Sequence, residues 1–370
     1  MSMSPPRPGS SGDRISEDEP PQTLETIEAA IQQLEAATVE ASRTATTTQP
    51  AFQAVHLDRL ADLYFSKYEI TGNDDDLQRA NSRSRDACVS GARASFQQPP
   101  GHSRAAQWHA LQGSRLTLRY ERFGDRKDLD DAINVYGEAL RSLTEESGLQ
   151  AVILMNQANA LCTRYEADGA TEDIEAAIRK AKDSLAASGS NAATVHNDLS
   201  TMYLSMYEKE GEVEHLEQAV SFAKEAVDKT DASDARLPTR LLNLASCLRA
   251  LYDQNEQFLH IEETVITLQK AEQAGRGDGS SFLPHILSRL AHALYVRYTR
   301  AKESADLFEA MSKGEEALEL AEGASASNFH PEVRRHLTTL LGTCREEARE
   351  YEDVDVAGRE EVVEAGASSR

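Results

Sequence analysis

Six tyrosines are each followed, nine residues later, by a leucine or an isoleucine. The pairs are Tyr68/Leu77, Tyr120/Leu129, Tyr165/Ile174, Tyr207/Leu216, Tyr252/Ile261 and Tyr298/Leu307. A fixed spacing that persists while the surrounding residues change is typical of one structural unit repeated along the chain. Arrays of such units bind other molecules over an extended surface more often than they catalyse reactions. The spacing therefore predicts a repeat protein and favours binding.

Each tyrosine ends a predicted helix, called helix A below, and is numbered as position zero. In most repeats apolar residues lie four, eight and eleven residues earlier, which are intervals of one helical face. The residue at minus seven is always small: Ala61, Gly113, Ala158, Ser200, Ala245 and Ala291. A small side chain at a fixed helical position lets a neighbouring helix approach closely. Helix A is therefore expected to pack tightly against a partner.

A stop signal and a start signal follow the tyrosine and predict a second helix, B. At plus four, where a helix end favours a left-handed residue, four repeats have glycine: Gly72, Gly124, Gly169 and Gly211. Glu256 and Lys302 replace it in the last two repeats, so we expect a less regular turn there. At plus eight four repeats have an aspartate, a predicted N-cap of helix B: Asp76, Asp128, Asp173 and Asp306.

The order of large and small residues in both helices resembles the tetratricopeptide repeat (TPR). It is visible in Leu244, Ala245 and Leu248 of helix A, followed by Thr264 and Ala271, seven residues apart, in helix B. The resemblance implies a right-handed superhelix of antiparallel helix pairs. The TPR unit has about 34 residues, whereas these units recur every 42 to 52 residues. We therefore expect helix A to be longer than in the family, by about two turns.

The longer unit, with phrases such as RYERFGD (119–125) and DLDDAI (128–133), resembles the TPR-like arrays of fungal proteins that often precede a caspase-like CHAT peptidase domain. That peptidase would need an α/β region of its own. No stretch of this sequence alternates in the manner of strands. The resemblance therefore implies the helical array without the peptidase.

The predicted fold is an all-α solenoid of about 14 antiparallel helices over residues 22–351. Residues 27–31 repeat the sequence of residues 174–178 and predict a lone B helix at the start. The predicted units are a half-repeat at 22–41, repeats at 54–104, 105–150, 151–193, 194–238, 239–284 and 285–331, and a capping helix at 332–351. Residues 1–21 and 352–370 are polar and are predicted to be disordered tails.

The net charge and the cysteines of the chain indicate which class of partner and which cellular compartment to expect. A net charge of −23 disfavours nucleic acid, because most of the surface would repel phosphate. No apolar run approaches the roughly 18 residues needed to cross a bilayer, so we expect no membrane insertion. The four cysteines are scattered and form no C-x-x-C pair, so reduced, buried thiols are expected: Cys88, Cys162, Cys247 and Cys344. We therefore expect a cytoplasmic protein.

The sequence offers no set of residues for catalysis, metal binding or cofactor binding. A nucleophilic cysteine needs a base within hydrogen-bond reach, but His336 and Cys344 lie two helical turns apart on one predicted helix. His285 and His292 are seven residues apart, not the four that bring two imidazoles onto one zinc ion. We expect a non-enzymatic protein with no catalytic residues, no metal and no cofactor.

The candidate binding surface is the inner face of helix A. In the TPR family this face lines a concave groove, and the resemblance maps it onto positions minus nine, minus six and minus three. They hold Arg59, Asp62, Ser114, Asn156, Asn159, Asp198, Thr201, Asn243, Ser246, Arg249, Arg289 and His292. Asparagine amides suit an extended peptide because they both donate and accept hydrogen bonds. Arg249, Arg289 and His292 could hold an acidic group, although the family's lysine-rich clamp for a C-terminal carboxylate is absent. The alternative is that these side chains are simply the solvated faces of amphipathic helices.

A second cluster of basic residues directly precedes the tyrosine in four repeats: Lys67, Arg119, Arg164 and Arg297. Ion pairs with the acidic segments that follow would explain this cluster without any ligand, and we adopt that structural interpretation.

The leading functional hypothesis is a scaffold that binds a protein segment in the groove of the A helices. One alternative is a regulatory or assembly subunit that acts through its ends or outer face, for example by self-association. Another is an accessory protein of a metabolic pathway. The sequence identifies neither the partner nor the oligomeric state.

Overall fold

The structure is a computed structural model that describes residues 23–43, 49–95, 104–143, 148–187, 192–277, 282–322 and 331–367. In these ranges the chain forms fourteen α-helices and no strand, which confirms the all-α prediction. The predicted tail at 1–21 lies outside the described residues. The helices are α1 (Leu24–Arg43), α2 (Gln49–Thr71), α3 (Asp74–Ser95), α4 (Arg104–Phe123), α5 (Arg126–Ser142), α6 (Gly148–Asp168), α7 (Thr171–Ala187), α8 (Ala192–Glu210), α9 (Val213–Asp228), α10 (Leu237–Asn255), α11 (Phe258–Gly277), α12 (Leu283–Ala301), α13 (Ser304–Glu322) and α14 (Pro331–Ala367).

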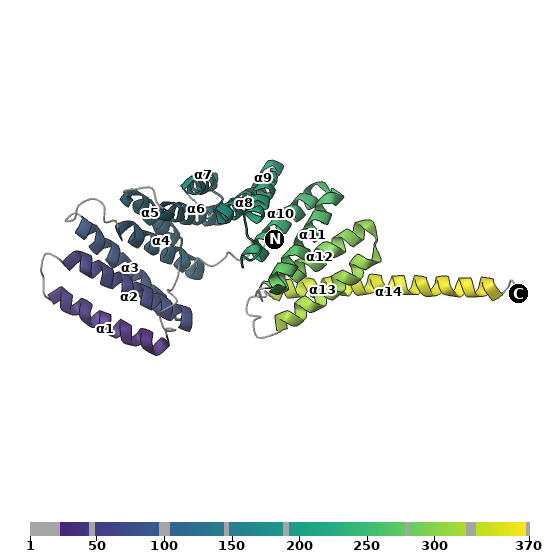
Figure 1. The fold of residues 1–370 in the computed structure, drawn as a ribbon, viewed down its shortest axis with the longest axis horizontal. Coiled ribbons are helices and arrows are strands. Elements are labelled where there is room, and N and C mark those ends of the chain that lie inside the picture. Colours follow the sequence, from purple (N-terminus) through teal and green to yellow (C-terminus); the bar gives the residue numbers. More distant parts are fainter. Residues whose placement is uncertain are drawn as a thin grey trace. The chain divides into compact units, whose positions relative to one another are not determined.

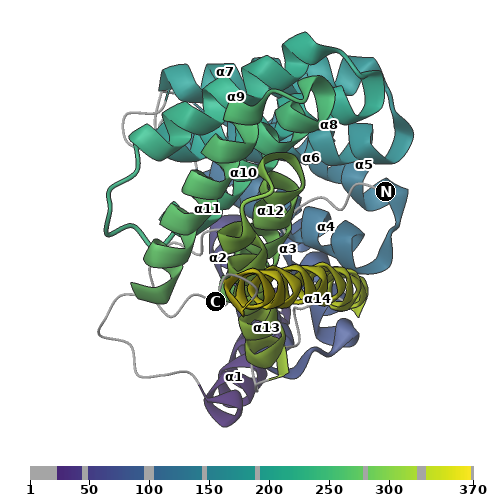
Figure 2. The same ribbon diagram turned by 90° about the vertical axis from the view of Figure 1, so that its right-hand side faces the viewer.

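The even-numbered helices α2 to α12 are the predicted A helices, and the odd-numbered helices α3 to α13 are the B helices. The chain divides inside α8 into two compact units, residues 1–195 and 196–370. In the N-terminal unit, α1 packs on α2, and α2, α4 and α6 each pack on the helix that follows (Figure 1). In the C-terminal unit, α10 and α12 each pack between two B helices, and α14 packs on α13 and α12 (Figure 2).

The residues of the repeated spacing form the core. At plus nine, all six leucine or isoleucine side chains are 0% exposed. The small residues at minus seven are buried as well. Near Gly113 an added Cβ atom would lie 2.6 Å from a ring carbon of Tyr136, so that position has no room for a larger residue. Small buried residues at plus twelve and plus nineteen complete the contact in all six repeats, as Ala310 and Ala317 do in the sixth.

The turn after helix A has the same geometry in all six repeats. The four glycines at plus four have φ between 65° and 76°, and Glu256 and Lys302 have φ of 52° and 58°. In every repeat the amide at plus four donates to the tyrosine carbonyl, at 2.7 to 2.8 Å. The expectation of a less regular turn in the last two repeats is therefore wrong. Side-chain contacts compensate for the left-handed backbone, because Glu256 pairs with Arg300 and the Lys302 ammonium lies 4.9 Å from the Tyr298 ring centroid.

The prediction that the aspartates at plus eight are N-caps is also wrong. Each B helix of a full repeat begins at plus six, so these aspartates are the third helical residue. The cap lies earlier in the chain: the Asp125 carboxylate accepts the Lys127 amide at 3.0 Å, and Asn73 accepts the Asp75 amide at 3.1 Å. The aspartates at plus eight are buried instead.

The C-terminal helix is longer than predicted. α14 begins at Pro331, close to the expected start of the capping helix, and continues to Ala367, past the expected end at residue 351. The sequence from 352 to 367 contains no proline, and the helix continues through Gly358.

The turn geometry predicts that glycine matters more in the fourth repeat than in the fifth. No atom lies within 4 Å of a Cβ added to Gly211, so Gly211→Ala should cost only left-handed strain, about 1–2 kcal/mol of local stability. Glu256→Gly should change stability by less than about 1 kcal/mol, because strain relief offsets the lost Arg300 pair. Amide hydrogen exchange at the two turns measures both effects. Equal destabilisation by the two substitutions would contradict the argument.

Candidate functional site

The residues predicted to line the inner face differ in solvent exposure. The exposed members are Arg59, Asp62, Arg289 and His292. The half-buried members are Ser114, Asn156, Asn159, Asp198, Thr201, Ser246 and Arg249. Asn243 is buried.

In the N-terminal unit, Asp62 on α2 is tied to Arg115 on α4. The buried Arg115 guanidinium hydrogen-bonds to the Asp62 carboxylate and donates to Ser84 Oγ on α3 at 2.6 Å. Desolvation raises the pKa of Asp62, although the charge of Arg115 opposes this. Sequence reasoning missed Arg115. The signal was present, because Arg115 is the one charged residue at minus five, where the other repeats have Leu63, Ala160, Met202, Cys247 and Ala293.

In the C-terminal unit, Asn243 on α10 joins Asn197 on α8. The Asn243 amide donates to Asn197 Oδ1 at 2.8 Å, and both residues are buried. Asn197 was not among the predicted residues, since its position is polar in some repeats and apolar in others. Asn243 thus connects two neighbouring A helices and has little surface left for a ligand.

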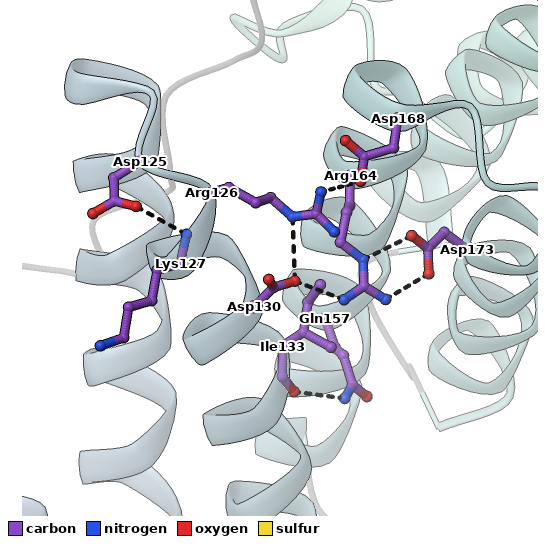
Figure 3. A network of polar contacts seen from close by, with 9 residues as sticks. All are labelled: Asp125, Arg126, Lys127, Asp130, Ile133, Gln157, Arg164, Asp168 and Asp173. Atoms are coloured by element: carbon purple, nitrogen blue, oxygen red, sulfur yellow. Dashed lines mark hydrogen bonds and ion pairs between the residues drawn. The ribbon is translucent and has the colours of Figure 1, made fainter.

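Asn156 and Asn159 on α6 are the inner-face asparagines whose side chains make no hydrogen bond within the described residues. Both are half-buried. Gln157, which lies between them in sequence, is committed instead, because its amide donates to the Ile133 carbonyl on α5 at 3.1 Å (Figure 3). The half-exposed amides of Asn156 and Asn159 can therefore both donate to and accept from another chain.

Arg249 on α10 and His292 on α12 meet in the C-terminal unit. Arg249 Nη1 lies 2.8 Å from His292 Nδ1, and Arg249 Nε donates to Asp253 at 3.0 Å. Desolvation by surrounding protein and then the charge of Arg249 lower the pKa of His292 to about 4. At neutral pH the imidazole is therefore neutral, and its Nδ1 accepts the hydrogen bond from Arg249. The same two causes, desolvation first, lower the pKa of the nearby Arg289.

The second basic cluster is structural, as predicted, but its partner is the aspartate at plus eight. Arg164 Nε donates to Asp173 at 2.7 Å and Arg297 Nε donates to Asp306 at 2.7 Å, and the second hydrogen bond of each pair makes it bidentate. Arg119 binds Asp128 in the same way. Lys67 differs, because its ammonium pairs with Glu28 on α1 at 2.8 Å and lies 4.0 Å from Asp76. We call the three arginine–aspartate pairs the A–B clasps, because each joins the end of helix A to the start of helix B.

The clasp of the third repeat extends into the second. Arg164 also donates to Asp130 on α5 at 2.9 Å, and Arg126 pairs with both Asp130 and Asp168 (Figure 3). Desolvation opposes ionisation of Asp130, but the hydrogen bonds and charges of Arg164 and Arg126 outweigh it and lower the pKa of this carboxyl. The network therefore holds neighbouring repeats in register.

The fourth and fifth repeats replace both members of the clasp together. Met206 and Leu251 stand at minus one, and His215 and His260 stand at plus eight. His215 Nδ1 lies 3.4 Å from Glu210, and His260 Nδ1 lies 3.1 Å from Asn255 Oδ1. Each histidine thus turns to the polar residues of its own A–B turn.

The four cysteines are buried and form no disulfide, which confirms the structural interpretation. Burial raises the pKa of Cys88 to about 12 and that of Cys247 and Cys344 to about 11, so these thiols stay protonated at neutral pH. Within the described ranges, no group of three or more His, Cys, Asp or Glu side chains is arranged to hold a metal ion.

Among the described helices, none combines the length and the hydropathy of a membrane span.

The chain is similar to solved helical repeat structures. The C-terminal part of a TPR repeat-containing protein from Cytophaga hutchinsonii has a TM-score of 0.50 and 11% identity, over 84% of this chain and 98% of that chain. The fold is a TPR-like helical repeat. BtubC from P. vanneervenii has a TM-score of 0.46 and 18% identity, over 68% of this chain and 92% of that chain. The S. pombe nuclear import adaptor Nro1 has a TM-score of 0.43 and 14% identity, over 86% of this chain and 99% of that chain. No protein-family model and no curated protein matches the sequence.

Replacing an arginine of a clasp should destabilise the fold strongly, whereas replacing an arginine of an exposed ion pair should destabilise it weakly. Arg164→Gln should destabilise the surrounding repeats by about 2–4 kcal/mol, because it leaves the Asp173 carboxylate unpaired in a mostly buried position. Arg179→Gln removes an exposed pair with Glu175 and should cost less than about 0.5 kcal/mol. Urea unfolding and hydrogen exchange measure both. Asp173→Asn should cost little once Arg164 is replaced, and a full additive cost would contradict the clasp.

Proposed function

We propose that this protein is a non-catalytic scaffold that binds a segment of a partner protein along the inner faces of its A helices. The proposal rests on how the repeat divides its side chains. The tyrosine-linked leucines, the small residues and the clasps are all used within the array. Asn156 and Asn159 are half-exposed amides at the inner positions with no hydrogen-bond partner in the described residues. Polar groups that the fold does not use are available to an extended peptide.

The proposal also includes a relationship to the long-repeat fungal arrays and a cytoplasmic location. The repeat length of 42 to 52 residues supports kinship with the long-repeat fungal arrays that precede CHAT peptidases. Four buried cysteines that form no disulfide support a cytoplasmic location, because a reducing compartment keeps thiols from forming disulfides.

Asn159→Arg tests the groove directly. A long cationic side chain at this position should block a bound segment, so partners captured by the wild-type chain from a lysate of the native host should be lost. Asn134→Arg is the matched control, because Asn134 is exposed on the B helix α5. Circular dichroism establishes that both variants fold. Recovery of the same partners by wild type and Asn159→Arg would reject binding through this face.

Self-association through the outer face is the alternative function. Leu259 on α11 and Phe308 on α13 are 57% and 47% exposed, and both lie on B helices. Apolar side chains on a surface favour contact with another protein surface. A mass that rises with concentration in light scattering, and stays constant in a Leu259→Lys and Phe308→Lys variant, would favour this alternative over the groove.

A further inference from the structure

The inner positions of α10, α12 and α14 are basic, whereas α8 has Asp198 at minus nine and the chain as a whole carries a net charge of −23. On α10, α12 and α14 the positions minus nine, minus six and minus three contain no carboxylate, when α14 is aligned with Arg345 at position zero. They hold Asn243, Ser246, Arg249, Arg289, His292, Tyr295, His336, Thr339 and Gly342. Carboxylates contact two of these side chains from neighbouring positions, Asp253 at Arg249 and Glu347 at Tyr295, and none contacts Arg289 within the described residues.

Arg249 is held in place by two hydrogen bonds, but not all of its N–H donors are used. His292 and Asp253 each accept one of its hydrogen bonds, and its guanidinium carbon lies 5.8 Å from the Tyr252 ring centroid. A guanidinium has five N–H groups, so three remain available. The neutral His292 imidazole orients the arginine without adding a charge.

Arg289 has no acidic partner among the residues that the structure describes. Its side chain is exposed, and within the described residues it makes no hydrogen bond or ion pair. Arg289 lies one helical turn before His292 on α12, and His292 Nδ1 is 2.8 Å from Arg249 Nη1, so the two arginines share this part of the surface. Other arginines on the A helices are compensated, for example Arg115 by Asp62 and Arg297 by Asp306. Two neighbouring guanidinium groups in an acidic protein are most stable when an anion lies between them.

The contrast with Arg59 shows that this arrangement is specific to the C-terminal unit. Arg59 is exposed at minus nine on α2, the same position that Arg289 occupies on α12. The charge near Arg59 is the carboxylate of Asp62, whereas the charge near Arg289 is another arginine. Position alone therefore does not create the uncompensated charge.

We propose that Arg249 and Arg289 form a subsite for one anionic oxygen group, a carboxylate or a phosphate, carried by a side chain of the bound protein segment. This proposal rests on the groove function proposed above. Planar guanidinium groups match the oxygens of carboxylate and phosphate in geometry and charge. A short segment with one anionic group needs only local compensation, whereas a nucleic-acid backbone would meet the net negative charge of the remaining surface.

Inorganic phosphate and glutarate are the probes, each added to the full chain at low ionic strength. Binding is followed through the Nε–Hε resonances of the arginines by NMR, assigned with Arg249→Gln and Arg289→Gln. We expect saturable shifts at Arg249 and Arg289. Arg289→Gln should weaken binding at least tenfold, and the matched control Arg59→Gln should leave it within twofold. Folding of each variant is checked by its backbone amide spectrum.

The two probes distinguish the source of the group. Binding of phosphate alone supports a phosphorylated side chain, and binding of glutarate supports an aspartate or glutamate. Absence of saturable binding by either probe, or equal weakening by Arg59→Gln, overturns the proposal. Tighter binding of a short DNA duplex with the same dependence on Arg289 overturns the assignment to a protein segment.

Failure of the subsite is distinguishable from failure of the groove. If Asn159→Arg abolishes partner capture and neither probe binds, the groove function stands and the subsite is rejected. If the probes bind but Asn159→Arg has no effect on capture, the anion site stands and the assignment to a segment in the groove is overturned.

Discussion

The turn between helix A and helix B is the constraint on which the rest of the structure depends. A left-handed residue at plus four donates to the tyrosine carbonyl in all six repeats, at 2.7 to 2.8 Å. This bond fixes where helix B begins, and the residue at plus nine then always reaches the core with 0% exposure. Because helix B always starts at plus six, the aspartate at plus eight meets the arginine at minus one. One local geometry thus sets the packing of each helix pair and the position of its ion pair.

The fold could be predicted because its determinants repeat, whereas the details of the turn depend on partners far away in the sequence. Glycine marks a left-handed residue, but its absence at Glu256 does not mark a different turn, since the compensating Arg300 lies 44 residues later. The aspartates at plus eight resemble N-caps because spacing alone does not fix the first helical residue. α14 continues past residue 351, the expected end of the capping helix, because no proline follows to stop it.

The inner positions could be predicted from the repeat, but their chemistry could not. The repeat places Arg59 and Arg289 at the same position of helix A. Asp62, three residues after Arg59, is visible in the sequence, whereas the contact of Arg249 with His292, beside Arg289 on another helix, comes only from the structure. Asn243 belongs to the predicted set but is buried against Asn197, a pairing across 46 residues that no local pattern reveals. Arg115 could have been found from sequence, as the single charge in an otherwise apolar column.

The A–B clasp also determines where such an array can be recombined. Its two members, at minus one and plus eight, lie on either side of the turn and change together, as Met206 with His215 and Leu251 with His260 demonstrate. If repeats are exchanged between two arrays at a junction between a B helix and the next A helix, both members of the clasp are transferred together. A crossover inside the turn would instead set an arginine from one parent opposite a histidine from another. The natural unit of exchange is therefore the helix pair with its own turn.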